Sequence, residues 1–446
     1  MSKGDCILAI DAGTSSLKAR VFDADLNSVA ETHQPYEYTT SAGMAVQMDV
    51  EKIWQALLEA CRQFKPWLDK IGVVVPSVLC PGLTAMDEAG NALYPAIIHI
   101  DRRSTRQAKE ALKRIGKETF LRITGNLPYP GGISLTGMLW LKENEPDIFC
   151  KAHVFGHINT YLARRLTGRW GIDPTNASFT GLYETVSGNS WSREIASGLE
   201  LPLEKMPPVL RPEQVVGHIT AEASALTRVP EGVPVLMGAN DTSSAAFGAG
   251  VTETGQMLNI VGSSEIFVIC TDKPVPNESY YVRQHVKPGR WLIMVITTAG
   301  FSLEWFRKQF CREMEADEFY KEYLPTVLRE KDTGGVQFRP YLIGDRNSMA
   351  QKQASFAGLT LATTREQCIL SIVTGGMTPM KKAISKCRRS VKLSGTISLT
   401  GGGVNETTIS LKQAMFPGFK FERIEASSLL GAAKLGRQHL QGERTS

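Results

Sequence analysis

The sequence predicts an α/β protein built from two domains, and three observations lead to this expectation. The chain has 446 residues, which is too long for one hydrophobic core and suggests two domains of roughly 200 residues each. Its first third alternates apolar runs of strand length with amphipathic stretches of helix length. Two similar strand–turn–strand units, about 250 residues apart, indicate a duplicated architecture in which each half offers a small-residue turn to one shared ligand.

The first strand–turn–strand unit opens the chain. Residues 6–10 form an apolar run typical of a buried strand, and residues 17–22 alternate apolar and polar side chains as a half-buried strand does. The turn Gly13-Thr14-Ser15 between them exposes backbone N–H groups and hydroxyls, the donors that a phosphate chain needs. Asp11 ends the first strand, where its carboxylate can orient a hydrated Mg²⁺ beside such phosphates. An ordinary hairpin with a polar turn is the alternative interpretation.

The remaining elements of the first third follow from hydrophobic periodicity and from helix breakers. Strands are expected near residues 27–32 and at 73–79, and helices at 50–64, 106–115 and 139–149. The segment 125–132 is rich in Gly and Pro and must form a loop. This loop serves either as a rigid connector or as one wall of a cleft.

Asp241 is the candidate general base. An apolar strand ends at Gly238, and small residues that can pack a helix tightly follow Asp241. We expect Asp241 at the N-cap of that helix, where a carboxylate stabilises the helix by ~1 kcal/mol. A carboxylate at a strand end that opens onto a cleft can also accept a proton from a substrate hydroxyl. The two roles are compatible.

The second half contains the other strand–turn–strand unit and a glycine-rich turn. Apolar runs at 257–261 and 266–270 flank the turn 262–265, which has no acidic residue at the place corresponding to Asp11. Only the first half is therefore expected to anchor a metal. A strand at 397–400 leads into three consecutive glycines, which let the backbone approach a flat or charged ligand closely. Neither the spaced glycines of a dinucleotide site nor the Gly-Lys-Ser/Thr of a P-loop is present.

Composition excludes several classes of function. The net charge is +5, but Lys and Arg are scattered along the chain, which argues against nucleic acid as a partner. The eight cysteines are spread singly and the seven histidines lack metal-ligand spacing, as in a protein with reduced thiols and no zinc site. No secretory signal and no apolar run of ~18–20 residues is found. We expect a cytoplasmic protein without a membrane partner.

Taken in order, these segments resemble the FGGY family of carbohydrate kinases, and within it the xylulokinase-like members. The family belongs to the superfamily that includes actin and hexokinase. The resemblance begins with Asp11-x-Gly13-Thr14 and runs along almost the whole chain. The similar segments are 11–18, 95–103, 166–168, 173–178, 238–250, 262–264, 299–306, 340–346, 356–359, 401–403 and 431–433.

The resemblance implies two RNase H-like domains, of the actin-like ATPase type, flanking a cleft. Residues 1–248 would form the domain that binds sugar and carries the base, and residues 249–446 the domain that binds ATP. It implies a kinase dependent on ATP and Mg²⁺, with Asp241 as catalytic base and Asp11 as metal ligand. Phosphate contacts would be Gly13, Thr14, Ser15, Lys18, Gly262 and Ser263. Contacts to the rest of the nucleotide would be Gly401, Gly402, Gly403 and Asn405.

Departures from the family pattern concern the sugar. Many members carry Gln-Met-His or Arg-Glu where this chain has Cys80-Pro81, and His99 stands where tryptophan is usual. Cys80, Pro81, Asp173 and Asn176 are the candidate sugar contacts, with ordinary loop packing as the alternative for each. The expected acceptor is a hydroxyl of a small sugar, best a ketopentose such as xylulose, in a chain compatible with a homodimer.

Two alternatives to a ketopentose kinase stay open. One is a glycerol, erythritol or gluconate kinase of the same family. The other is a non-catalytic ATP-binding sensor, which the joint presence of Asp11 and Asp241 argues against, because a pure binder needs no base.

Overall fold

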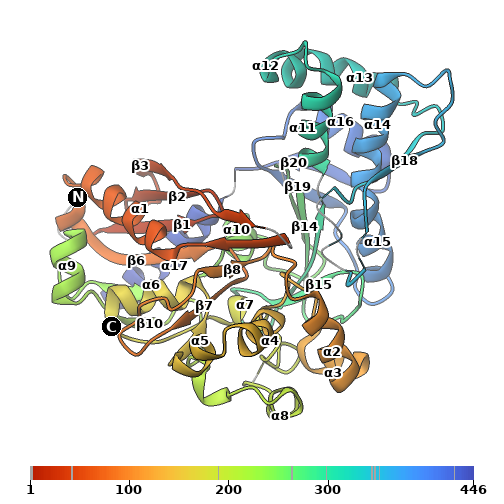
Figure 1. Cartoon of the computed structure of the whole chain (residues 1–446). Coiled ribbons are helices and arrows are strands. Elements are labelled where there is room, and N and C mark those ends of the chain that lie inside the picture. Colours follow the sequence, from red (N-terminus) through yellow and green to blue (C-terminus); the bar gives the residue numbers. More distant parts are fainter. Residues whose placement is uncertain are drawn as a thin grey trace.

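The computed structural model describes residues 4–41, 44–188, 190–262, 265–297, 299–342, 345, 348–350, 352–425 and 427–445. The chain forms an α/β structure around two large mixed sheets, which confirms the predicted fold class. In Figure 1 the first sheet lies in the red and orange part, and the second rises from the centre toward the cyan and blue helices. None of the helices in the described ranges is both long and apolar enough to cross a bilayer.

The first sheet has the strand order β10-β11-β6-β1-β2-β3, with β12 also paired to β6. Its strands are β1 (Cys6–Ala12), β2 (Ser16–Phe22), β3 (Ser28–Pro35), β6 (Ile71–Val78), β10 (Val215–His218), β11 (Pro234–Leu236) and β12 (Ala239–Asn240). The pair β1–β2 is the predicted hairpin, with Asp11 opposite Lys18. Strand β6 pairs with β1 in parallel, and β12 pairs with β6 in parallel, so the three strands run in the same direction.

Helices cover both faces of this sheet because side chains alternate along a strand. Leu8 and Ile10 pack in one core cluster with α1 (Val50–Gln63) and α6 (Ile158–Thr167). Ile7 and Ala9 point to the other face and pack with α17 (Ser428–Thr445). Helix α17 thus brings the last residues of the chain back to the first sheet, where it also packs against α10 (Asp241–Gly248). Gly431 permits this approach, because a Cβ there would lie 1.9 Å from the Ser244 carbonyl oxygen.

The second sheet has the strand order β15-β16-β14-β13-β19-β20. Its strands are β13 (Met257–Ile260), β14 (Glu265–Thr271), β15 (Tyr281–Gln284), β16 (Trp291–Thr297), β19 (Thr396–Thr400) and β20 (Lys420–Arg423). On one face lie α11 (Ala299–Phe310), α13 (Leu324–Glu330), α14 (Arg365–Gly376), α15 (Thr378–Cys387) and α16 (Glu406–Met415). From the other face Leu258, Val268 and Met294 pack into a cluster shared with the first half of the chain.

That shared cluster rests on a smaller sheet and its helices. The smaller sheet has the order β4 (Thr39–Ser41), β5 (Ala45–Met48), β8 (Ala96–Ile98), β7 (Gly82–Met86) and β9 (Val154–Gly156). Around it lie α2 (Thr105–Ile115), α3 (Lys117–Thr124), α4 (Ser134–Asn144), α5 (Pro146–Lys151), α7 (Pro174–Ala177) and α8 (Arg193–Leu199). Helix α9 (Ala221–Thr227) packs instead with α1 and α6 on the first sheet. The chain also forms α12 (Ala316–Glu318) and the pair β17 (Gln337–Arg339) and β18 (Ser355–Ala357).

Two element predictions are wrong in detail. The single helix expected at 139–149 is two helices, α4 and α5, which meet at Pro146, because proline cannot donate an intrahelical N–H but suits a helix start. The strand expected to end at Gly238 is split into β11 and β12. Gly238 has φ +68°, which breaks the strand, and its backbone passes close to Pro76.

The loop 125–132 connects the two halves. Asn126 accepts from Val282 N at 2.8 Å and donates to Val282 O at 2.8 Å, so its amide pairs with the open edge of β15. The Tyr129 hydroxyl donates to Glu278 O at 2.7 Å. These contacts favour the connector interpretation, and they satisfy an edge strand that would otherwise leave buried backbone groups unpaired.

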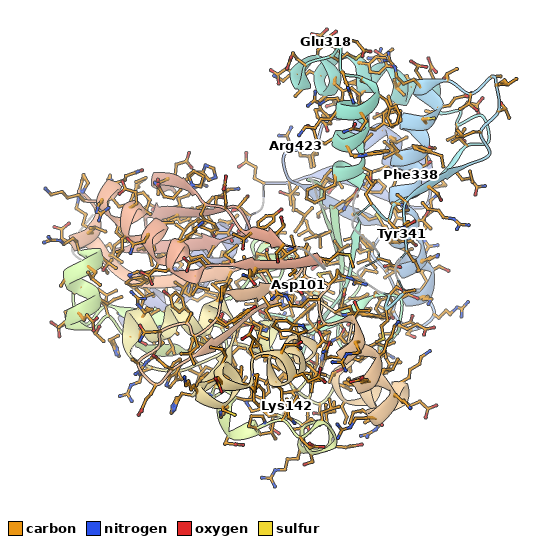
Figure 2. The ribbon with its side chains drawn as sticks, viewed as in Figure 1. Asp101, Lys142, Glu318, Phe338, Tyr341 and Arg423 are labelled. Atoms are coloured by element: carbon orange, nitrogen blue, oxygen red, sulfur yellow. The ribbon has the colours of Figure 1, made fainter. Side chains whose placement is uncertain are left out.

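A second contact between the halves lies on the segment that contains Asp101, labelled near the centre of Figure 2. Asp101 is buried and accepts from Val46 N at 2.5 Å and from Arg103 Nε at 2.7 Å. The neighbouring Arg102 donates to Ser348 O at 2.7 Å and to Pro130 O at 3.3 Å. Arg102 therefore links the loop after β17 to the first half. The predicted domain boundary at residue 248 stays a prediction.

Asn126→Ala should destabilise the protein by about 2–4 kcal/mol, because it leaves the N–H and C=O of Val282 buried without partners. Urea unfolding of both proteins measures this. Asn144→Ala, which removes an exposed side chain that donates to Trp140 O, is the matched control and should change stability little. Equal stability of the Asn126 and Asn144 variants would show that the hydrogen bonds between Asn126 and Val282 contribute nothing to stability.

Candidate functional site

The candidate site forms where three parallel strands end. Asp11 in β1 pairs with Ser77 in β6, and Ser77 pairs with Ala239 in β12 on its other side. Asp11, at the end of β1, and Asp241, directly after β12, therefore come to one edge of the sheet. Ligands of open α/β sheets bind at the carboxyl ends of the strands. The register thus brings together the two predicted carboxylates, which lie 230 positions apart in the sequence.

Asp11 has one carboxylate oxygen that accepts no hydrogen bond in the described part of the chain. Its Oδ1 is buried and has no hydrogen-bond partner among the described residues. Burial and repulsion by the Asp241 carboxylate raise the pKa of Asp11 to about 6, although the attraction of Lys18 opposes the shift. An orphaned buried carboxylate oxygen is a suitable ligand for a hard divalent cation, so this residue fits the Mg²⁺ predicted for it.

The turn after β1 directs its donors away from the protein. Tyr36 binds its carbonyls, since the Tyr36 hydroxyl donates to Gly13 O at 2.7 Å and the Tyr36 N–H donates to Ser15 O at 3.0 Å. The N–H groups of Thr14 and Ser15 have no acceptor within the described part of the chain. These two N–H groups are the donors predicted for phosphate.

Asp241 does not cap its helix, and that prediction is wrong. The N-cap of α10 is Asn240, whose Oδ1 accepts from Ser243 N at 2.9 Å, and Asp241 is the first helical residue. Asparagine is as good a cap as aspartate, and it leaves the carboxylate of Asp241 for other contacts. That carboxylate accepts only from Thr242 in the described structure, through Thr242 N at 2.6 Å and Oγ1 at 3.1 Å. Burial raises the pKa of Asp241, and the nearby Arg283 guanidinium lowers it in part.

Asp173 and Asn176 lie entirely inside the protein. Asp173 caps α7, and its Oδ1 accepts from Thr175 N at 2.8 Å and from the Thr175 hydroxyl. Its Oδ2 accepts from Asn159 Nδ2 at 2.9 Å and from Asn176 Nδ2 at 2.5 Å. Neither Asp173 nor Asn176 has exposed surface. The packing alternative fits both residues better than contact with sugar.

Cys80 is half-buried and Pro81 is buried, so Cys80 is the more exposed of these two predicted sugar contacts. Cys80 Sγ lies 3.9 Å from His157 Nδ1, and His157 Nε2 lies 2.7 Å from Ser134 Oγ. Burial lowers the pKa of His157 to about 4, so this imidazole is neutral at physiological pH. The His157 imidazole therefore adds no charge beside Cys80, where the nearby charged groups are Arg283, Asp241 and Asp173.

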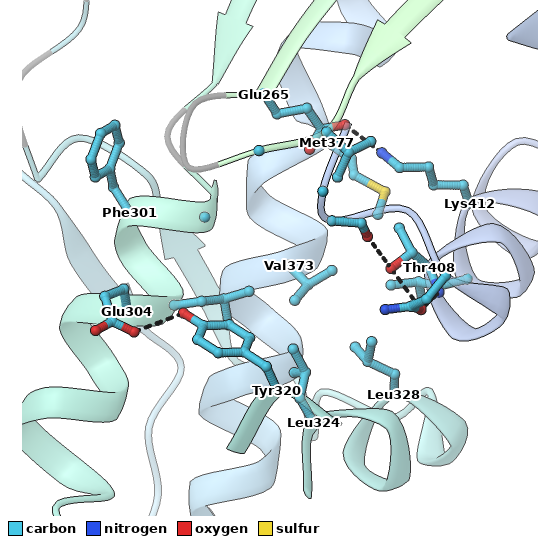
Figure 3. A pocket seen from close by; sticks show the side chains of 18 residues that line it. Glu265, Phe301, Glu304, Tyr320, Leu324, Leu328, Val373, Met377, Thr408 and Lys412 are labelled. Atoms are coloured by element: carbon cyan, nitrogen blue, oxygen red, sulfur yellow. Dashed lines mark hydrogen bonds and ion pairs between the residues drawn. The ribbon is translucent and has the colours of Figure 1, made fainter. Parts of the chain in front are cut away.

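The second sheet contributes a separate cavity of about 570 Å³, shown in Figure 3. Its lining includes four of the predicted nucleotide contacts, namely Gly262, Gly402, Gly403 and Asn405. They meet because β13 and β19 are parallel neighbours, so the turns after them emerge side by side. Gly403 N donates to Val261 O at 3.1 Å, which joins the two turns directly. Ser263 lies outside the described residues.

The chemistry of this cavity suits a flat ring with a polar tail. Apolar side chains form much of the wall, among them Phe301, Leu324, Leu328, Val373 and Met377 (Figure 3). A buried ion pair between Glu265 and Lys412 closes the end near the two turns. Gly401 has φ +105° and a Cβ there would lie 2.4 Å from Val261 O, so only glycine fits. Gly401 shapes the turn and does not line the cavity.

Sequence reasoning missed Arg283, which is buried near Asp241, and His157, which is buried beside Cys80. The available signal for Arg283 was a cation within the run Tyr281-Val282-Arg283, which is otherwise apolar. No comparable signal marks His157. Among the described residues no cluster of three His, Cys, Asp or Glu could hold a metal by itself.

Comparison with known sequences identifies relatives along most of the chain. The profile of the FGGY family of carbohydrate kinases, N-terminal domain, matches residues 6–248. A xylulose kinase of Bacillus subtilis is 26% identical over 443 residues, covering 96% of this chain and 87% of that protein. An autoinducer-2 kinase of Yersinia enterocolitica is 28% identical over 328 residues, covering 70% of this chain and 60% of that protein.

Solved structures match the whole fold. A ligand-bound xylulose kinase from Lactobacillus acidophilus superimposes with a TM-score of 0.88 at 22% identity, covering 98% of this chain and 89% of that one. A gluconate kinase from the same organism also gives 0.88, at 23% identity and the same coverage. Two kinases named for different sugars thus match equally well, so the fold does not select the sugar.

Asp173→Asn should lower stability by about 1–3 kcal/mol, because its new NH₂ group would face the NH₂ groups of Asn159 and Asn176. Urea unfolding measures this, with Asp147→Asn, an exposed carboxylate, as control. Unchanged stability together with a raised KM for the sugar would show instead that Asp173 contacts the sugar.

Proposed function

Because this chain belongs to the FGGY family of carbohydrate kinases, we propose that it transfers the γ-phosphate of ATP to a hydroxyl of a small sugar. Kinases of this family use ATP. The observation that carries the proposal is the strand register that brings Asp11 and Asp241 to one edge of the sheet. The charge of Asp241 adds to the effect of burial in raising the pKa of Asp11. A protein that only binds nucleotide has no use for the second carboxylate.

Each half of the site has a distinct task in this proposal. The cavity beside Gly402 and Gly403 accepts the adenosine, and the phosphates extend toward the turn after β1. Asp241 accepts the proton of the sugar hydroxyl as that oxygen attacks the γ-phosphorus. Mg²⁺ held by Asp11 would neutralise charge on the phosphate chain. Exclusion of water from the closed site would prevent hydrolysis of ATP.

The proposed substrate is a ketopentose such as xylulose. The match to a xylulose kinase over nearly the whole chain supports this choice. Gluconate, glycerol or erythritol is the second candidate, since a gluconate kinase shares the fold equally well and Cys80-Pro81 departs from the usual sugar contacts. A cytoplasmic location and a homodimer stay predictions from the sequence.

ADP release with Mg-ATP, measured across ketopentoses, ketohexoses, polyols and sugar acids, tests the function. Stimulation by one sugar is the expected result. Asp241→Asn should then lower kcat by about 10²–10⁴-fold, because the hydroxyl loses its base, while nucleotide affinity stays within a few-fold. The matched control is Asp147→Asn, which should keep full activity. Equal kcat in wild type and the Asp241 variant would contradict the assignment of the base.

The Mg²⁺ dependence of turnover should change with pH. Asp11 must lose its proton to bind a cation, and its pKa is raised to about 6, so apparent Mg²⁺ affinity should fall as pH drops below about 6. Asp11→Ala should weaken Mg²⁺ affinity at every pH and remove this dependence. Titrations of Mg²⁺ at pH 5.5 and 7.5 measure both effects. The same Mg²⁺ affinity in wild type and variant would contradict the metal role of Asp11.

A further inference from the structure

Arg283 is a cation buried at the centre of the proposed active site. It lies on β15, the edge strand of the second sheet, and only 1% of it is exposed. The Cys80 thiol and the carboxylates of Asp241 and Asp173 lie near enough to interact with its charge. A strand of the second sheet thus places a positive charge among carboxylates that belong to the first half.

The contacts of this guanidinium are few for a buried group. One Nη donates to Asn240 Oδ1, and the other lies 2.9 Å from the sulfur of Met294, a weak acceptor. Its central carbon lies 4.0 Å from the centroid of the Phe179 ring. Its Nε has no partner among the described residues. Burial of such a group is costly unless nearby charges compensate, and here the two carboxylates and the ring do so.

The strong contact of Arg283 falls on the residue that sets the start of α10. Asn240 Oδ1 accepts both from Arg283 and from Ser243 N, the bond that caps the helix. The Asn240 amide also donates to Thr175 O at 2.9 Å, and Asn240 N donates to Thr175 Oγ1 at 2.9 Å. Asn240 is therefore fixed between α7 in the first half and β15 in the second. Asp241 is the next residue.

We propose that Arg283 is a positioning residue, which holds Asn240, and through it the catalytic base Asp241, in the orientation needed for phosphoryl transfer. This inference rests on the proposed function, because it assigns Arg283 a task in the transfer step. It also couples the base to the second sheet, which carries the nucleotide cavity. Arg283 has almost no exposed surface, so it acts through Asn240 and not by contact with sugar.

A double-mutant cycle tests the proposal. Arg283→Met removes the charge at similar length, and Asn240→Ser keeps a helix-capping oxygen that is too short to reach Arg283. Each single change should lower sugar-dependent kcat by about 10²-fold, the cost of a small misplacement of a catalytic group, with sugar KM and nucleotide Kd within about threefold. The double variant should lose little more than one single variant, because the two residues act as a unit.

Two further variants separate positioning from general damage to the fold. Arg283→Lys keeps the charge and should recover part of the lost kcat. Phe120 belongs to the same hydrophobic cluster as Phe179, the ring beside Arg283, but lies away from the site. Phe120→Leu should therefore leave kcat unchanged. If Arg283→Met does not fold, the cycle is run with Arg283→Lys. Independent losses that multiply in the double variant, or an unchanged kcat in Arg283→Met, would overturn the proposal.

Hydrogen exchange of the peptide 237–248 gives a readout that does not depend on turnover. Arg283→Met should speed exchange at the start of α10, whereas Phe120→Leu should not. If no sugar stimulates the wild type, the proposed function fails. Unchanged exchange at α10 in Arg283→Met would overturn the link through Asn240 even then.

Discussion

The parallel register of β1, β6 and β12 is the constraint on which the site depends. Because Asp11, Ser77 and Ala239 align across three adjacent strands, the carboxylates of Asp11 and Asp241 must share one edge of the sheet. A shift of β1 by one residue would turn the Asp11 side chain to the opposite face of the sheet. Cores on both faces prevent such a shift, with α1 and α6 on one face and α17 on the other.

Burying several carboxylates close together costs free energy, because each loses its hydration and repels the others. Hydrogen bonds from the surrounding residues offset part of this cost. Asp173 accepts hydrogen bonds from Thr175, Asn159 and Asn176, whereas one oxygen of Asp11 has no partner among the residues that the structure describes. Burial raises the pKa of both carboxyl groups to about 6, so each carries part of the cost of desolvation.

The sequence predicted local structure well and long-range contacts poorly. Both strand–turn–strand units and the amphipathic helix α1 are confirmed, because their patterns are local. The family resemblance ordered these pieces into the correct fold. The cap of α10 was assigned one residue too late, since Asn240 and Asp241 have similar capping propensities and only backbone geometry distinguishes them. Asn126 and Arg283 act on partners more than 40 positions away, which no single-sequence pattern reveals.

The central claim is that one reaction centre lies between Asp11 and Asp241, and that ATP bound in the cavity of the second sheet extends its phosphates to it. Anomalous diffraction from crystals grown with ADP and Mn²⁺, a cation that accepts the same oxygen ligands as Mg²⁺, tests it most directly. The account predicts a metal peak bound to Asp11, directly or through one water, on the side that faces Asp241, with adenine in the cavity beside Gly402 and Gly403. A metal bound elsewhere, or adenine outside that cavity, would contradict it.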